Sequence, residues 1–148
     1  MRVLVRPIEP TDEADWRRLW TRHLDFYETA VPEEVYRSTF GRIVGEDPQD
    51  FNGFIAELNG QAVGLAHYLF HRHCWRIENV CHLQDLFADE ATRGRGVGRA
   101  LIEAVYAAAD EAGAPAVYWL TQDFNKEARK LYDRIGKVTP FVKYQRQV

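Results

Sequence analysis

The feature that most constrains this chain is a glycine-rich turn, Arg93-Gly94-Arg95-Gly96-Val97-Gly98-Arg99, between an apolar run at 80–88 and a helical pattern that opens at 98–102. A helix that begins at such a turn directs free backbone N–H groups outward, and its dipole favours negative charge there. Glycines let a bulky anion approach the backbone, and arginines add charge-assisted contacts to phosphate. The turn therefore predicts a strand–turn–helix unit that binds a pyrophosphate.

The spacing of the glycines excludes two common nucleotide motifs. The turn lacks the Gly-Lys-Ser/Thr ending of a P-loop. The dinucleotide fingerprint needs a third glycine where Arg99 stands and an acidic residue about twenty residues later, and that region is Tyr118-Trp119-Leu120. The pattern that fits is Arg93-x-x-Gly96-x-Gly98, which resembles the Gln/Arg-x-x-Gly-x-Gly/Ala signature of the GCN5-related N-acetyltransferases (GNAT). That family holds the coenzyme A pyrophosphate on this turn.

A second segment supports the same resemblance. Residues 125–136, Asn-Lys-Glu-Ala-Arg-Lys-Leu-Tyr-Asp-Arg-Ile-Gly, are similar to the GNAT pattern Asn-x-x-Ala-x-x-Leu/Phe-Tyr-x-x-x-Gly, although Lys137 stands where the family usually has Phe. Gln84-Asp85-Leu86-Phe87-Ala88 resembles the strand that pairs with the acyl-coenzyme A arm. The resemblance covers most of residues 50–148. Within the family, the chain looks most like the fungal histone and polyamine acetyltransferases and the spermidine/spermine N-acetyltransferases.

Length and composition set the broad class. With 148 residues, 46% hydrophobic and 28% charged, the chain has the size of a single globular domain, which we place over residues 1–148. No apolar stretch is long enough to cross a membrane, and residues 1–7 read as a strand rather than a signal peptide. Two cysteines make no disulfide framework, which favours a cytoplasmic location. A net charge of −3 argues against broad nucleic-acid binding.

Hydrophobic periodicity predicts an element order of β, α, α, β, β, β, α, β, α, β. Trp16, Leu19, Trp20, His23 and Leu24 share one helical face, with Thr11 as the expected cap. Asn59-Gly60 between apolar runs predicts a hairpin. The other expected elements are a strand at 3–5, a helix from Pro32, strands at 77–88 and 116–120, helices at 98–113 and 125–135, and a strand-like tail from Val138. This order predicts an α/β domain with a mixed central sheet flanked by about four helices, and the resemblance implies that its fold is of the GNAT type.

The resemblance implies how acetyl-coenzyme A is held. The backbone of Leu86, Phe87 and Ala88 would pair with the pantetheine arm, and the strand that contains them would diverge from its neighbour near 118–120. Asn125 would contact the arm near its thiol end. The pyrophosphate would lie on the turn formed by Arg93, Gly94, Arg95, Gly96, Val97, Gly98 and Arg99.

Tyr132 occupies the position of the family's general acid. A phenol with a pKa near 10 is protonated at neutral pH, so it can donate to a leaving thiolate. The pattern alone favours a plainer reading, in which Tyr132 packs beside Ala128 and Leu131 on one helical face. With the family match, we predict the acid role.

The sequence offers several candidates for the general base. The spermidine/spermine branch has a Glu where this chain has Gln84, which cannot accept a proton. Candidates are Asp85, His82, Glu78 and Glu28, and bracing of the turn is an equal alternative for Asp85. The spacing His71-x-His73-Cys74 fits no common zinc pattern, so we expect no metal.

These features predict an acetyl-coenzyme A-dependent N-acetyltransferase in which a primary amine attacks directly. Residues 1–60 hold 12 Asp and Glu against 7 Arg, which suits a cationic small-molecule acceptor such as a polyamine, diamine or amino acid. The alternatives are a protein or peptide acetyltransferase and a non-catalytic acyl-coenzyme A sensor. The family often forms dimers, and the strand-like tail after Val138 suits pairing between two subunits, so a homodimer is expected.

Overall fold

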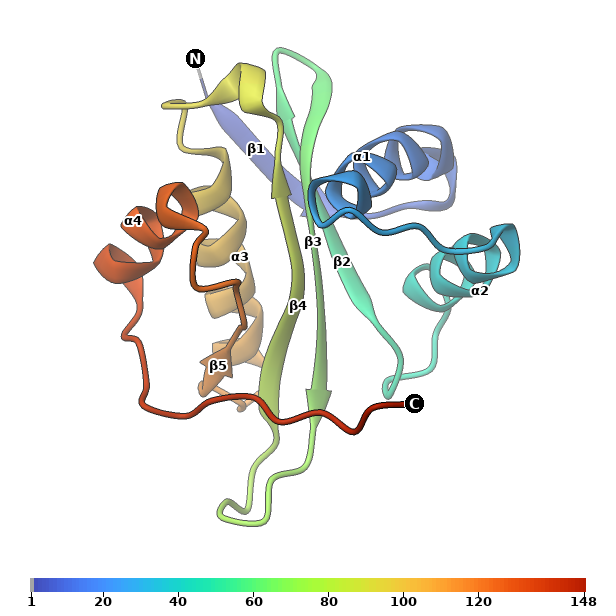
Figure 1. Cartoon of the computed structure of the whole chain (residues 1–148). Coiled ribbons are helices and arrows are strands. Elements are labelled where there is room, and N and C mark those ends of the chain that lie inside the picture. The colour runs from blue at the N-terminus through green and yellow to red at the C-terminus, as the bar shows by residue number, and fades with distance from the viewer. Residues whose placement is uncertain (1) are drawn as a thin grey trace.

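A five-stranded mixed sheet organises the molecule (Figure 1), in a computed structural model that describes residues 2–148. The strands lie in the order β1 to β5 and antiparallel up to β4, while β5 runs parallel to β4. Their bounds are β1 Val3–Pro7, β2 Asn52–Leu58, β3 Gln61–His71, β4 Val80–Ala88 and β5 Val117–Tyr118. The mixed α/β sheet that the sequence predicts is confirmed.

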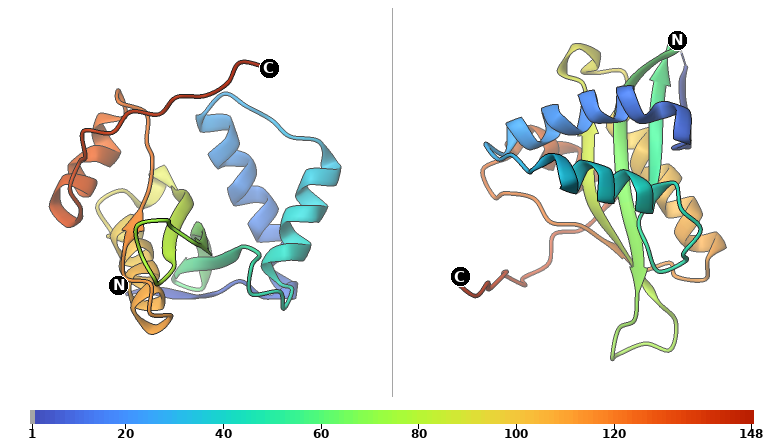
Figure 2. Two further views of the ribbon diagram at one scale, coloured as in Figure 1. Left: turned by 90° about the horizontal axis from the view of Figure 1, so that it is seen from below. Right: turned by 90° about the vertical axis from the view of Figure 1, so that its right-hand side faces the viewer.

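Helices cover both faces of this sheet (Figure 2). α1 (Glu13–Phe26) and α2 (Glu33–Ile43) lie on one face, and α3 (Val97–Glu111) lies on the other. α4 (Lys126–Ile135) follows β5 on the α3 side. Short 3₁₀ turns at Pro10–Asp12 and Glu90–Thr92 precede α1 and the glycine-rich turn.

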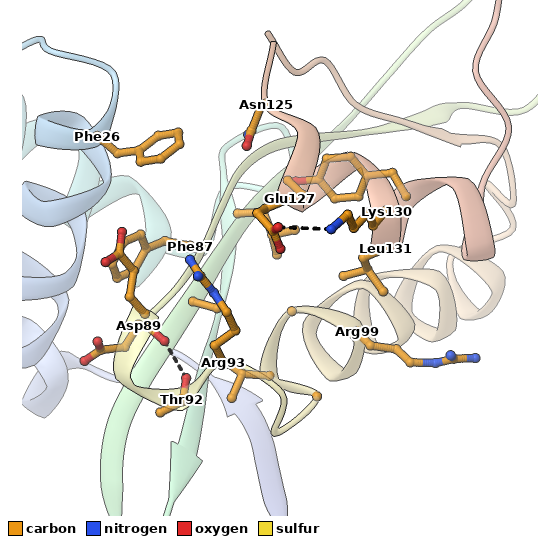
Figure 3. A pocket seen from close by; sticks show the side chains of 18 of the residues that line it. Phe26, Phe87, Asp89, Thr92, Arg93, Arg99, Asn125, Glu127, Lys130 and Leu131 are labelled. Atoms are coloured by element: carbon orange, nitrogen blue, oxygen red, sulfur yellow. Dashed lines mark hydrogen bonds and ion pairs between the residues drawn. The ribbon is translucent and has the colours of Figure 1, made fainter. Parts of the chain in front are cut away.

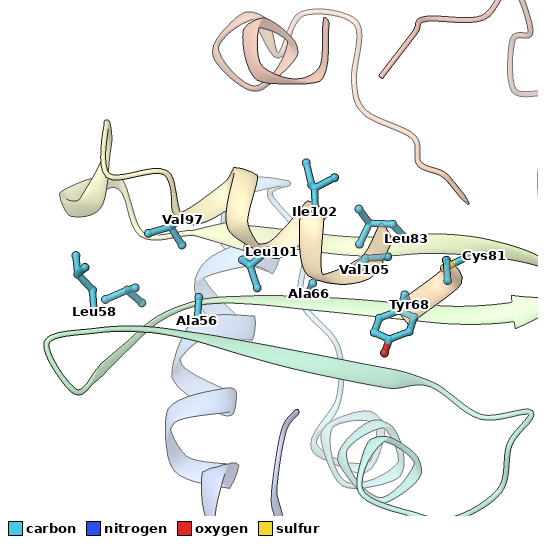
Figure 4. Packing of buried hydrophobic residues seen from close by; sticks show 12 residues of the cluster. Ala56, Leu58, Ala66, Tyr68, Cys81, Leu83, Val97, Leu101, Ile102 and Val105 are labelled. Atoms are coloured by element: carbon cyan, nitrogen blue, oxygen red, sulfur yellow. The ribbon is translucent and has the colours of Figure 1, made fainter. Parts of the chain in front are cut away.

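Two hydrophobic clusters hold the layers together because side chains alternate between the faces of each strand. Ile55 and Leu65 are fully buried toward α1 and α2, where Trp16 and Leu19 pack. Their neighbours Ala56 and Ala66 belong to the cluster under α3 (Figure 4). The buried residues of α3 are Val97, Leu101, Ile102, Val105 and Ala109, the period expected for one helical face.

The start of α3 approaches β3 so closely that only glycine fits at position 64. A Cβ on Gly64 would lie 2.7 Å from the carbonyl oxygen of Phe87 and 2.9 Å from Cγ1 of Val97. Gly64 pairs with Ala88 at the end of β4, and the short 3₁₀ turn Glu90–Thr92 leads from there to the glycine-rich turn. The position of that turn is therefore fixed by close backbone packing.

Several local predictions are confirmed. The β2–β3 hairpin turns at Asn59 and Gly60, whose φ angles of +55° and +76° fit a type I′ turn. Trp16, Leu19, Trp20 and His23 are buried along one face of α1. α2 begins directly after Pro32.

Other local predictions are wrong. No strand forms after Val138, where Pro140 removes a backbone donor and the two-residue β5 offers too little edge to pair with. The predicted buried strand at 116–120 shrinks to Val117–Tyr118, and Tyr118 is 40% exposed. β4 begins at Val80 instead of Ile77, which lies exposed in the preceding loop. Thr11 lies within the first 3₁₀ turn, and Asp12 takes the N-cap position of α1.

Candidate active site

A cavity of about 500 Å³ lies where the end of β4, the glycine-rich turn, α4 and the C-terminal end of α1 meet (Figure 3). Segments far apart in the sequence thus form its wall. Most of the residues that the sequence predicts for the site lie in this wall, namely Leu86, Phe87, Ala88, Arg93, Gly94, Gly96, Val97, Gly98, Arg99, Asn125 and Tyr132. Arg95 and Asp85 do not line the cavity.

The glycine-rich turn presents open backbone to the cavity. Gly94 and Gly96 have φ angles of +83° and +79°, and a Cβ at either position would meet no atom within 4 Å. The first N–H of α3 to bond back is that of Ala100, which donates to the Gly96 oxygen (3.0 Å). The N–H groups of residues 97–99 have no acceptor within residues 2–148. This arrangement fits a bound phosphate group.

β4 offers an unpaired backbone edge beside this turn. β5 pairs with β4 only at Cys81 and His82. From Leu83 to Ala88, β4 is paired with β3 but has no strand on its other side within the described part of the chain. The predicted divergence of these strands is confirmed, and the free N–H and C=O groups can bond an extended arm as an added strand would.

Tyr132 faces the cavity from α4, with its ring 5.5 Å from that of Trp119. Burial raises the pKa of Tyr132 to about 12, and the nearby Tyr27 adds to the effect. The phenol is therefore protonated across the neutral range and presents a hydrogen-bond donor. The first turn of α4 brings Asn125 to the same cavity.

A buried polar cluster lies behind the cavity and centres on Asp85 of β4. Its Oδ2 lies 2.8 Å from Nδ1 of His67 and accepts from the Trp20 indole N–H (3.2 Å), while its Oδ1 lies 3.2 Å from Nε2 of His23. The Trp16 indole N–H donates to Nε2 of His67 (2.8 Å). Burial alone would raise the pKa of Asp85, but the hydrogen bonds from His23 and His67 outweigh it and hold that pKa well below its usual range.

Sequence reasoning missed this cluster. It placed His23 on the apolar face of α1 and gave His67 no role, although it did select Asp85. The signal was present, because each is a titratable residue at a position whose neighbours are apolar. His23 also lines the cavity, so it connects the cluster to the predicted site.

The other candidate bases lie outside the wall of the cavity. His82 stacks flat on Tyr118, with ring centroids 4.5 Å apart, and burial lowers its pKa. Glu78 is exposed in the β3–β4 loop beside Arg76. Glu28 follows α1 in a left-handed conformation with a φ of +55° and is exposed.

Two further properties concern the described residues as a whole. Within 2–148, no three His, Cys, Asp or Glu side chains gather in a group able to hold a metal ion. Among the same residues, no helix combines the length and the apolar character needed to span a membrane.

Comparison with known proteins assigns this architecture to a family. The family model described as "Acetyltransferase (GNAT) family" matches residues 16–136. The D-amino-acid N-acetyltransferase HPA3 of Saccharomyces cerevisiae is 41% identical over 146 residues, which cover 98% of this chain and 91% of the yeast protein. A thialysine N-epsilon-acetyltransferase of Bos taurus is 31% identical over 74 residues, or 50% of this chain and 43% of the bovine protein.

Solved structures show the same fold. The aminoglycoside N-acetyltransferase AAC(6')-Iy bound to a bisubstrate analogue superposes with a TM-score of 0.85 and 22% identity, over 100% of this chain and 99% of that one. A ribosomal-protein-alanine N-acetyltransferase from Brucella melitensis gives a TM-score of 0.79 with 16% identity, over 99% and 100% of the two chains. At these identities, the likeness concerns the fold.

Proposed function

The chain belongs to the acetyltransferase (GNAT) family and is an acetyl-coenzyme A-dependent N-acetyltransferase, and on that premise we propose that its acceptor is the amino group of a free amino acid, foremost a D-amino acid. The observation that carries this proposal is the 41% identity to a D-amino-acid N-acetyltransferase along nearly the whole chain. The acidic first 60 residues, with 12 Asp and Glu against 7 Arg, suit a cationic ammonium group.

We assign the predicted residues to holding acetyl-coenzyme A. When bound, this molecule supplies a thioester carbonyl that an amine can attack and a sulfur that leaves. The free edge of β4 at Leu86–Ala88 would bond its pantetheine arm, and Asn125 would contact the arm near the sulfur. The turn at 93–99 and the open N-terminus of α3 would hold its pyrophosphate.

We assign Tyr132 to the leaving sulfur. Its phenol donates a hydrogen bond as negative charge develops there, and a pKa of about 12 keeps that donor present throughout the neutral range. Its place in the wall of the cavity, on the helix that begins after Asn125, supports this assignment.

The acceptor is tested by measuring coenzyme A release with a panel of D- and L-amino acids, polyamines, diamines and a basic peptide. The proposal expects the highest kcat/KM with one or more D-amino acids. Activity confined to polyamines or diamines would mean that the acceptor is a small amine other than an amino acid. Activity with the peptide alone would indicate a protein acetyltransferase, and tight coenzyme A binding without any turnover would indicate a sensor.

Arg93→Ala is expected to weaken coenzyme A binding about 10-fold, because a hydrogen bond to a charged group contributes about 1.5 kcal/mol or more. Arg93 reaches into the cavity (Figure 3). Arg95 does not line the cavity, so Arg95→Ala serves as the matched control and is expected to have a smaller effect. Isothermal calorimetry measures both affinities. Equal losses would place the pyrophosphate elsewhere on the turn.

We also propose that two copies of the chain form a homodimer through the tail after Val138. Val138, Phe141, Val142 and Tyr144 expose apolar surface, and Leu120 near β5 does the same. Such exposed apolar side chains commonly mark an interface. Light scattering is expected to give twice the chain mass of 17.2 kDa for the wild type and the single mass for Phe141→Asp. A single mass for the wild type would refute the proposal.

A further inference from the structure

We propose that His23 is the general base of the reaction and that Asp85, braced by His67, is the positioning residue that holds its ring. This inference rests on the proposed acceptor, an amine that arrives as an ammonium ion and must lose a proton before it can attack. His23 is the member of the buried polar cluster that also lines the cavity.

The hydrogen bonds fix which nitrogen of each histidine carries a proton. An indole N–H can only donate, so Nε2 of His67, which accepts from Trp16, holds a lone pair. Its Nδ1 therefore carries the proton and donates to Asp85. Protonation of both His67 nitrogens would break the bond to Trp16 in a site where His67 is 4% exposed. Both nitrogens of His67 are thus engaged, and neither is free to take a proton from the acceptor amine.

His23 lines the cavity and retains one ring nitrogen without a partner among the described residues. A carboxylate only accepts, so Nε2 of His23 donates to Asp85 and its Nδ1 holds the lone pair. Nδ1 has no hydrogen-bond partner within residues 2–148. Among those residues, no enclosed side-chain nitrogen or oxygen lacks a partner, so this unpaired Nδ1 is accessible rather than sealed in.

One carboxylate and two aromatic rings surround His23. Asp85 faces it from β4 as a carboxylate, because the hydrogen bonds to that group hold its pKa low, and its negative charge stabilises an imidazolium ion. Tyr27 faces it from the next turn of α1, with a ring separation of 5.2 Å, and burial raises the pKa of Tyr27 so that it stays neutral. The Phe87 ring lies edge-on to the His23 ring, with centroids 6.3 Å apart.

The proton transfers of this reaction balance without another reactant. One N–H bond of the ammonium breaks and an N–H bond forms at Nδ1 of His23, which leaves the amine nitrogen with its lone pair. That lone pair forms the amide bond as the carbon–sulfur bond breaks and the sulfur departs with both electrons. The sulfur takes the proton of the Tyr132 phenol, and the second amine proton restores that phenol. His23 then releases its proton to water. The net change is ammonium plus thioester to amide, thiol and one proton.

The test is the pH profile of kcat/KM for His23→Gln with the best acceptor of the panel. The Gln amide can still donate to Asp85 but cannot take a proton. Loss of a general base is expected to lower kcat/KM about 10²-fold near pH 7. Without the base, only acceptor that is already neutral reacts, so the deficit shrinks about tenfold with each unit of rising pH until the acceptor's own pKa.

A merely structural role would lower the profile at every pH without changing its shape, and that result would overturn the proposal. His73→Gln, a substitution in the exposed β3–β4 loop, is the matched control and is expected to leave the profile unchanged. No transfer by the wild type would refute the proposed function instead, so the two failures are distinguishable.

A second readout needs neither substrate nor turnover. Nitrogen-15 NMR of the histidine rings in the wild-type protein is expected to show His23 with its proton on Nε2 at high pH and His67 with its proton on Nδ1. A His23 ring with its proton on Nδ1 at high pH would overturn the proposal even if His23→Gln failed to fold.

Discussion

Tyr132→Phe is expected to lower kcat by about 10²-fold to 10³-fold while leaving the affinity for coenzyme A within about twofold. The substitution removes one oxygen and keeps the ring that packs against Trp119. Because the Tyr132 hydroxyl makes no hydrogen bond within residues 2–148, its loss is expected to change the free energy of unfolding by less than about 0.5 kcal/mol. Steady-state kinetics, calorimetry and thermal unfolding measure the three quantities separately.

The pH dependence of this loss is also specific. The raised pKa of Tyr132, about 12, keeps the phenol protonated from acid to mildly alkaline pH, so the ratio of wild-type to variant kcat is expected to stay constant from about pH 6 to 10. Tyr144→Phe, in the exposed tail, is the control and is expected to retain full activity. An unchanged kcat for Tyr132→Phe would show that Tyr132 serves only to pack α4 and is not the acid.

Gly64→Val is expected to lower the free energy of unfolding by more than about 3 kcal/mol, a shift in Tm of roughly 10 °C for a chain of this size. The added Cβ would lie 2.7 Å from the Phe87 oxygen, a backbone atom that can move only if β4 moves. It would also press on Val97 and Leu101 at the start of α3. The folded fraction is expected to bind coenzyme A more weakly, because both walls of the turn are displaced.

Gly41→Ala is the matched control for this prediction. Gly41 lies inside α2, and a Cβ there would meet no atom within 4 Å. Alanine restricts the unfolded chain and favours the helix, so this variant is expected to gain about 0.5–1 kcal/mol. Thermal and denaturant unfolding compare the two substitutions. A Gly64→Val protein as stable as the wild type would show that β3 and α3 can separate at little cost.

Most of the fold could be predicted from local patterns in the sequence. The Asn59-Gly60 turn and the periodic faces of α1 and α3 depend on residues near in sequence, and all appear as predicted. The tail was predicted wrongly because its alternating apolar residues satisfy the local strand pattern, whereas a strand also needs an edge to pair with. A two-residue β5 does not provide one.

The predicted and the missed parts of the site differ in the same respect, namely whether their residues are near in sequence. The arginine and glycine spacing of the turn is local, so the sequence identified the turn, and all its residues except Arg95 line the cavity. The polar cluster joins His23 to Asp85 across 62 residues and Trp20 to Asp85 across 65. No spacing rule connects such positions, because their contact depends on how α1 lies across β3 and β4. His23 was therefore assigned from its helical face alone.

The unpaired edge of β4 has a consequence for the behaviour of the protein in concentrated solution. A bare strand edge is a template on which other chains can assemble into aggregates. Here the part of that edge at Leu86–Ala88 borders a cleft between the C-terminal end of α1 and α4. A single slender arm can enter such a cleft, whereas the edge of a neighbouring molecule arrives with its whole sheet and is stopped by the two helices. The two helices beside this edge thus guard against polymerisation.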